Sequence, residues 1–210
     1  ACAVSDCDAS GGQEIAAVNS TLTRTTNWSN STVVYGQLLT WTGASGGSGW
    51  LTAANWDVGR APLASDRILI PATEVQPVLG ADAASIDLTV EAGATLDLAG
   101  FNYTVSENLA VTGTVKSAGT PTVTVGGNCD LTGASFNADG LTLLVAGTGE
   151  TVQTLNGGDA TVNRVVLRPG AAGLKVTQGF TAFYLSAEAE AARQIEFAAG
   201  ATVRARFSAD

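Results

Sequence analysis

The sequence predicts an all-β protein whose main body is a right-handed parallel β-helix, or β-solenoid. Apolar and polar residues alternate strictly on both sides of a turn in residues 88–98, and a period of two is typical of half-buried strands. The pattern of strand, Gly-Ala corner and strand returns in residues 165–176 and 195–207, with Gly93, Gly170 and Gly200 at the three corners. Charged residues make up only 14% of the 210-residue chain, which also contains 25 glycines. A chain that coils through such corners forms a solenoid.

From residue 66 onward, the chain reads as short strands separated by glycine-containing turns. The corner glycines at 93, 170 and 200 are unevenly spaced, so the length of a solenoid rung must vary, and a β-sandwich of the jelly-roll kind is the alternative fold. Residues 186–193 are the one segment expected to form a helical turn or a loop insert. The predicted strands are 67–70, 85–90, 94–98, 102–105, 108–111, 114–116, 121–125, 128–131, 141–145, 151–155, 161–167, 174–177, 181–185, 194–197 and 202–207.

Residues 1–40 are predicted to be an N-terminal extension, and residues 41–210 the solenoid domain. The extension contains two strand-like stretches, 13–26 and 31–41. This arm has two candidate fates, which are pairing with the chain's own sheet and addition to the exposed sheet edge of a neighbouring copy. In the second case, we expect residues 13–40 of one copy to complete the terminal sheet of the next.

The lead-in to the solenoid, residues 41–71, contains three of the four tryptophans of the chain. The first rung of a solenoid would expose its apolar end, and bulky rings cover a large area with few residues. Asp66 is expected to accept hydrogen bonds from backbone N–H groups or to pair with Arg60. The predicted structural cap consists of Trp41, Trp50, Asn55, Trp56 and Asp66. The alternative function for the tryptophans and Asn55 is a platform that stacks on sugar rings.

This lead-in resembles that of β-helical modules in large bacterial surface and autotransporter-type adhesins. The likeness extends with the following rungs over about residues 40–127. Such modules are mostly pieces of extracellular proteins and rarely carry a defined activity, so the resemblance implies an architecture more than a chemistry. The residues that carry it are Trp41, Gly43, Trp50, Asn55, Trp56, Gly59, Pro62, Asp66, Ile68 and Ile70.

The cysteines form an odd set of three: Cys2, Cys7 and Cys129. In a secreted chain, this number suggests one disulfide and one leftover thiol, or an intermolecular bridge. A bridge from Cys2 to Cys7 would close a small loop, whereas a bridge from either one to Cys129 would fasten the N-terminus to the coil. The sequence does not distinguish these connectivities. The absence of methionine indicates a chain processed by export and cleavage, or a trimmed fragment.

Net charge and composition exclude several classes of function. The net charge is −9, and nucleic acids and anionic membranes bind basic patches. No apolar run is long enough to span a bilayer, which takes about 20 residues. Residues 1–150 carry 14 acidic and 4 basic side chains, whereas residues 151–210 carry 5 and 6. This difference is either chance or a basis for attraction between the head of one copy and the tail of another.

Catalytic chemistry has little support in the sequence. Histidine is absent, which excludes Ser-His-Asp and Cys-His sites and histidine-bearing metal centres. Residues 6–11 match only the first half of a calcium loop, whose final glutamate would fall at Ala17, so no cofactor or metal is expected. Polysaccharide hydrolysis needs two carboxylates across the scissile bond, and Asp87 and Asp97 are the best pair among dispersed acids. These acids are Asp82, Asp87, Asp97, Asp130, Asp139 and Asp159.

Together, these observations predict an exported, non-enzymatic structural protein. We expect a subunit of an extracellular filament, surface layer or adhesin stalk that forms homo-oligomers or polymers head to tail. The alternative is a carbohydrate-binding or polysaccharide-processing β-helix module, for which glycans would be the partners.

Overall fold

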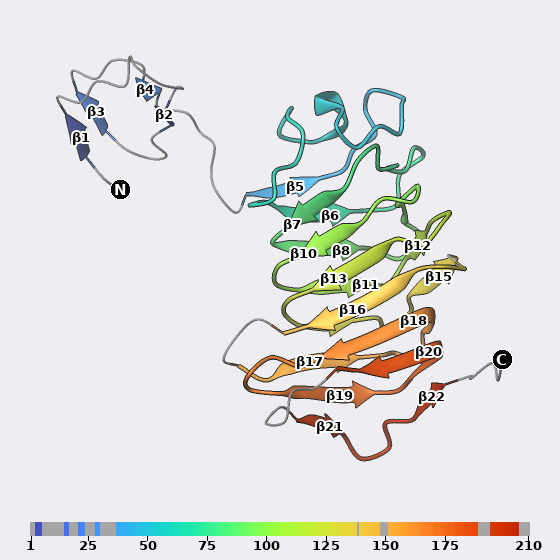
Figure 1. Ribbon diagram of the computed structural model, residues 1–210. Coiled ribbons are helices and arrows are strands. Elements are labelled where there is room, and N and C mark those ends of the chain that lie inside the picture. Colours follow the sequence, from blue (N-terminus) through green and yellow to red (C-terminus); the bar gives the residue numbers. More distant parts are fainter. Residues whose placement is uncertain are drawn as a thin grey trace. The chain divides into compact units, whose positions relative to one another are not determined.

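The chain divides into two compact units, residues 1–37 and 38–210. The computed structural model describes residues 37–137, 139–147, 151–188 and 194–205, together with four short strands nearer the N-terminus (Figure 1). The boundary lies three residues before the expected one. Strand β5 (Leu38–Thr40) pairs in parallel with β6 (Arg67–Ile70), so the solenoid begins with residues that the sequence had placed in the extension.

The N-terminal unit contains two pairs of parallel strands. Strand β1 (Ala3–Ser5) pairs with β3 (Thr21–Thr23), and β2 (Ile15–Ala16) pairs with β4 (Trp28–Ser29). Both pairs join alternate strands that run in the same direction. The described strands of the arm are therefore paired within their own unit, in parallel as in the main body.

The second unit is a parallel β-solenoid of about six turns, as expected. Each turn passes through up to three stacked parallel sheets (Figure 1). The first sheet contains β5, β6, β8 (Asp87–Val90), β11 (Leu109–Val111), β14 (Cys129–Asp130), β17 (Gln153–Asn156), β19 (Leu174–Gln178) and β21 (Ile195–Phe197). The second contains β7 (Ala83–Ser85), β10 (Tyr103–Val105), β13 (Thr122–Val125), β16 (Thr142–Ala146), β18 (Thr161–Arg168), β20 (Phe180–Ala187) and β22 (Val203–Ala205). The third contains β9 (Thr95–Asp97), β12 (Thr114–Lys116) and β15 (Ser135–Asn137).

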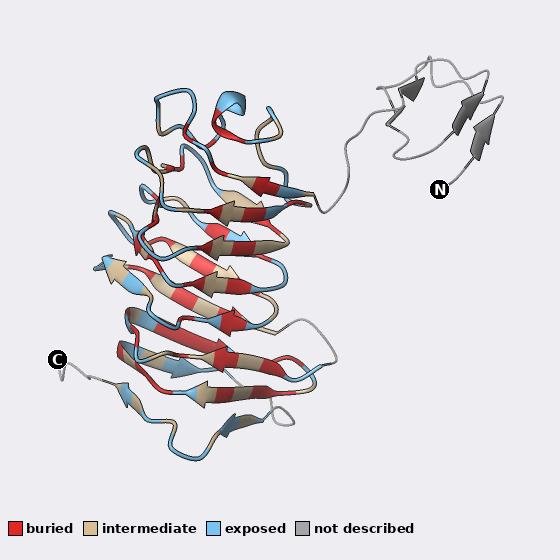
Figure 2. Cartoon of the chain, turned by 180° about the vertical axis from the view of Figure 1, so that it is seen from behind, coloured by how far each residue is buried: buried red, intermediate tan, exposed pale blue. Residues whose placement is uncertain are grey.

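The core consists of apolar columns that run along the solenoid axis. Buried residues alternate with more exposed ones on most strands (Figure 2), and the strand register places buried residues beside their equivalents in the next turn. Each column removes apolar surface from water in every turn, which is the main stabilisation of such a coil. One column of the first sheet contains Ile68, Leu88, Leu109, Cys129, Leu155 and Val176.

The register along this column gives the length of a turn. Leu88 pairs with Ile68 and Leu109, and Cys129 follows in the next turn, so these turns contain 20 or 21 residues. The next step, from Cys129 to Leu155, is longer. After this longer step, the Gln153 Nε2 donates to the carbonyls of Val125 and Gly127. A side-chain amide thus supplies hydrogen bonds to the backbone of the preceding turn.

Three of the corners between strands share one turn. The N–H of Ala94 donates to the carbonyl of Glu91, and Gly93 between them has φ +80°. The turns 131–134 and 198–201 repeat this bond, with Gly133 and Gly200 at the same place. A left-handed third residue strongly favours glycine. In the remaining predicted corner, the residue in the left-handed region is Gly173 and not Gly170.

Polar ladders cover two of the corners and use residues spaced by one turn. Asn102 donates to the carboxylate of Asp82 and accepts from the N–H of Thr122. A second ladder runs from Asp87 through Asn108 and Asn128 to Thr154. These side chains satisfy backbone donors that face solvent at the corners.

Helix is nearly absent, since the described residues contain a single 3₁₀ turn at Ala53–Asn55. In the segment expected to be a helical turn, residues 186 and 187 belong to β20, and residues 189–193 lie outside the described part. Among the described residues, no helix has the length and apolar character needed to cross a membrane.

Candidate functional site: the two ends of the solenoid

Four aromatic rings close the N-terminal end of the solenoid. Trp56 meets Trp41 and Trp50 edge to face, with ring centroids 5.2 and 4.9 Å apart. Trp50 meets Tyr103 in the same way at 5.7 Å. All four side chains are buried, and edge-to-face contacts add stability beyond the area that the rings cover. The rings therefore form a continuous layer over the first turns.

Two of the three tryptophans and the buried Asn55 bind backbone groups. The Trp41 Nε1 donates to the carbonyl of Val75 at 2.7 Å, and the Trp56 Nε1 donates to the carbonyl of Trp50 at 2.8 Å. The buried Asn55 donates to the carbonyls of Gly47 and Gly49 and accepts from the N–H of Ser45. A buried amide with these bonds fixes the shape of the glycine-rich loop that it spans.

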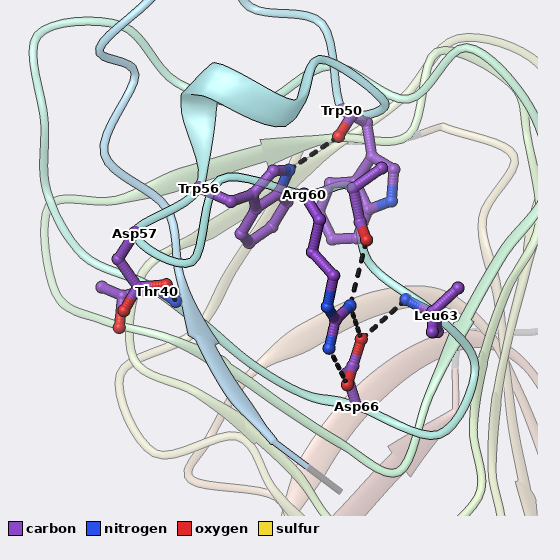
Figure 3. A network of polar contacts seen from close by, with 8 residues as sticks. Thr40, Trp50, Trp56, Asp57, Arg60, Leu63 and Asp66 are labelled. Atoms are coloured by element: carbon purple, nitrogen blue, oxygen red, sulfur yellow. Dashed lines mark hydrogen bonds and ion pairs between the residues drawn. The ribbon is translucent and has the colours of Figure 1, made fainter. Parts of the chain in front are cut away.

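A partly buried ion pair connects the cap to the first full turn (Figure 3). The Asp66 carboxylate accepts two hydrogen bonds from the Arg60 guanidinium, at 2.6 and 2.8 Å, and one from the N–H of Leu63 at 2.8 Å. The carbonyl of Asp66 accepts from the N–H of Ile86, at the next corner of the coil. Asp66 has no exposed surface, and the pKa of Arg60 is raised by its hydrogen bond to this carboxylate. Both partners expected for Asp66 are thus present together.

A glycine at the start of the cap is required by close approach. Gly43 has φ +64°, and a Cβ atom on it would lie 2.9 Å from the carbonyl oxygen of Val75. The same carbonyl accepts the Trp41 indole N–H. A larger residue at position 43 would push this segment of the cap away from Val75. The close packing of the two segments therefore explains the glycine in the Trp-x-Gly pattern.

The structure places all five predicted cap residues at this end, with Arg60 as the partner of Asp66. It contradicts the sugar platform on the tryptophans, because the three rings are buried and no face is left for a sugar. Sequence reasoning missed Tyr103, which lies on β10 in the second turn and donates to the hydroxyl of Ser85. Its only sequence signal is the alternation with Val105, which marks an inward position.

The C-terminal end differs from the capped end. In the register of the first sheet, Phe197 on β21 is the partner of Val176, a fully buried core residue. Phe197 is nevertheless 49% exposed, and Ile195 and Val203 at this end are partly buried. The last described turn thus presents core-type side chains to solvent (Figure 2).

Of the three cysteines, Cys129 is the one that lies in the described residues. Cys129 is a free thiol in the core column of the first sheet, 1% exposed. Burial raises its pKa, with a further contribution from the charge of Asp130. A thiol in this state is a poor nucleophile. Cys2 and Cys7 lie outside the described residues, so a bridge between them stays a prediction.

Three of the carboxylates considered for catalysis are used in structural contacts. Asp87 pairs with Arg67 on the first sheet, and Asp97 pairs with Lys116 on the third. The two lie on different sheets, so the structure does not bring them together. Asp82 belongs to a corner ladder. No group of three or more metal-ligating side chains occurs in the described part of the chain.

These features define a parallel β-solenoid that has an aromatic cap at its N-terminal end and an exposed Phe197 in its last described turn. Comparison with protein-family models, with curated proteins and with solved structures found no match. The function is therefore argued from the geometry of the two ends.

Proposed function

We propose that this protein is a structural subunit of an extracellular filament or cell-surface assembly, in which copies join head to tail. The resemblance of the lead-in to surface-protein modules and the low charge content support an extracellular setting. A head-to-tail contact repeats into a fibre unless its rotation closes a ring.

The observation that carries this proposal is the difference between the two ends. The aromatic cap covers the apolar interior at the N-terminal end of the solenoid. At the other end, Phe197 occupies a core register position and remains half exposed. Strands β21 and β22 are the last members of their sheets among the described residues, and edge strands of this kind pair readily with another chain.

The N-terminal unit is the proposed donor. Residues 38–40 are paired with β6 in their own solenoid, so the donor is confined to residues 1–37 rather than extending to residue 40. Its described strands pair in parallel, as do the strands of the turn that would receive it. Strand addition pairs backbone donors and acceptors, so we expect the joint to resist salt.

The unequal charge distribution along the sequence supports the same head-to-tail arrangement of copies. Residues 1–150 have a net charge of −10, and residues 151–210 have a net charge of +1. Opposite ends of two copies would therefore attract, whereas like ends would repel. Such charge guides the encounter more than it holds the joint.

Electron microscopy of the full chain and of a variant that lacks residues 1–35 tests this proposal. We expect fibres from the full chain and none from the deletion variant. Phe197→Glu should also prevent fibres, whereas Val152→Glu, which adds the same charge at another exposed apolar residue, should not. A full chain that stays monomeric at high concentration, or fibres from the deletion variant, would overturn the mechanism.

A further inference from the structure

A polar groove lies on the outer face of the second sheet, over β16, β18 and β20. Its volume is about 660 Å³, which falls in the range of small-ligand sites. It contains side chains from β16, β18 and β20 and from two corners of the coil. The residues that line it include Thr120, Asp139, Thr142, Asn163, Arg164 and Tyr184.

Arg164 differs from most other cations of the chain. Five of the seven basic residues in the described part form ion pairs: Arg60, Arg67, Lys116, Arg168 and Lys175. Arg164 has no carboxylate within 4 Å among the described residues. Its guanidinium carbon instead lies 5.5 Å from the centroid of the Tyr184 ring. Stacking on a ring orients the guanidinium and leaves its hydrogen-bond donors available to a carboxylate.

The groove lies on central strands, which determines how a ligand is recognised. Both β16 and β18 are paired on each side, so their backbone groups are used in the sheet and recognition must come from side chains. Thr142, Arg164 and Tyr184 are direct cross-strand neighbours. They form a row that crosses the strands, so a ligand along this row would follow the solenoid axis.

The chemistry of the row matches an acidic sugar. The Asp139 carboxylate, the Asn163 amide and the threonine hydroxyls can bind several hydroxyl groups, and Tyr184 offers a flat apolar surface. Arg164 supplies a planar donor for a carboxylate. We propose that this groove binds a glycan that carries carboxylate groups, such as a chain of uronic acids. The site is independent of head-to-tail assembly and distinct from the buried tryptophans.

Isothermal titration calorimetry of the full chain with a short oligogalacturonate tests the site. We expect saturable binding, and much weaker binding of the same oligomer after reduction of its carboxylates to alcohols. Arg164→Gln should weaken binding by about tenfold or more, because a charge-assisted bidentate contact is lost. Tyr184→Ala should also weaken it, through loss of the stacking surface and of the ring that holds Arg164.

Arg168→Gln is the matched control. It removes the same charge from the same strand, but Arg168 is paired with Glu188 and does not line the groove. The affinity of this variant for the oligogalacturonate should stay within about twofold of that of the unchanged chain, since exposed charges outside the site are screened. The inference is overturned if oligogalacturonate does not bind, if the reduced oligomer binds equally, or if Arg168→Gln weakens binding as much as Arg164→Gln. Repeating the titration with Phe197→Glu separates the groove from assembly.

Discussion

Trp56 is the residue on which the cap depends most, since its ring meets the two other tryptophans and its indole N–H binds the carbonyl of Trp50. Its loss would leave a cavity between two large rings and an unpaired carbonyl. Asp66 has a complementary role, because its side chain holds the loop at Arg60 and Leu63 and its carbonyl holds the next corner. The apolar and polar contacts thus fasten the same loop to the first turns.

Trp56→Ala should lower the free energy of unfolding by about 3–5 kcal/mol, as for other large-to-small changes in a core. Urea denaturation followed by tryptophan fluorescence and circular dichroism measures this. Leu51→Ala is the control, because Leu51 lies in the same loop and is 61% exposed. Equal stability of Trp56→Ala and the unchanged chain would show that the ring does not act as a cap.

Two buried acids predict a loss of stability at alkaline pH. Burial raises the pKa of the Cys129 thiol and of the Tyr103 hydroxyl. The folded state therefore keeps protons that the unfolded state releases above its ordinary values, about 8.5 for cysteine and 10 for tyrosine. The free energy of unfolding should keep its full value below about pH 8.5 and fall as the pH rises above it.

Urea midpoints between pH 7 and 10.5 measure this effect. Cys129→Val keeps an apolar residue in the column and removes the thiol. It should therefore reduce the loss of stability between about pH 8.5 and 10, the ordinary pKa values of cysteine and tyrosine. The same slope in both chains would contradict the assignment to Cys129. The later loss, above the ordinary pKa of tyrosine, should remain in Cys129→Val.

Individual roles in the cap were predictable to different extents. The position of Asp66 before an apolar strand and close to Arg60 was enough to predict both of its partners. Tyr103 was not predictable as a cap residue, because it lies far along the chain and reaches Trp50 only when one turn stacks on another. Such contacts depend on the register between turns, which the sequence does not state directly.

Successive turns of the solenoid approach each other closely at the corners. Several glycines lie there at positions where a side chain would collide with the neighbouring turn. A Cβ atom on Gly127 would lie 2.5 Å from the carbonyl oxygen of Glu107 in the preceding turn. By contrast, a Cβ atom on Gly80 would meet nothing within 4 Å. Close packing therefore excludes a side chain at position 127 but not at position 80.

Gly127→Ala should destabilise the protein by about 1–3 kcal/mol, because the methyl group forces two turns apart. Gly80→Ala should be neutral or slightly stabilising, since alanine restricts the unfolded chain. Thermal or urea unfolding of the two variants makes the comparison. If Gly80→Ala costs as much as Gly127→Ala, the close stacking of the corners is not the cause.

Strands were predictable where alternation was strong. Residues 67–70 and 114–116 match β6 and β12 in full. Strand β15 was missed, because Ser135–Asn137 contains a single apolar residue and is a strand only through its pairing with β12. The corner ladders were also missed, although Asp82, Asn102 and Thr122 recur at intervals of 20 residues. That spacing is the signal that would have given the length of a turn.

The two ends of the solenoid differ in the described residues: an aromatic layer covers the first turns, whereas the last described turn exposes Phe197. The uneven corner glycines obscured the regular turn length in the sequence, yet the repeated strands were enough to predict the solenoid. The groove at Arg164 and Tyr184 was not predictable, because it joins outward residues of three turns. Assembly through the open end remains the central proposal at this scale.

Mixing two variants tests this proposal most directly. The full chain with Phe197→Glu keeps its N-terminal unit and has a blocked open end, whereas the chain that lacks residues 1–35 has an open end and no donor. Each alone should sediment as a monomer, and an equimolar mixture should form a discrete complex of one copy of each. No association in the mixture, or polymers of either variant alone, would contradict donation of the N-terminal unit to the open end.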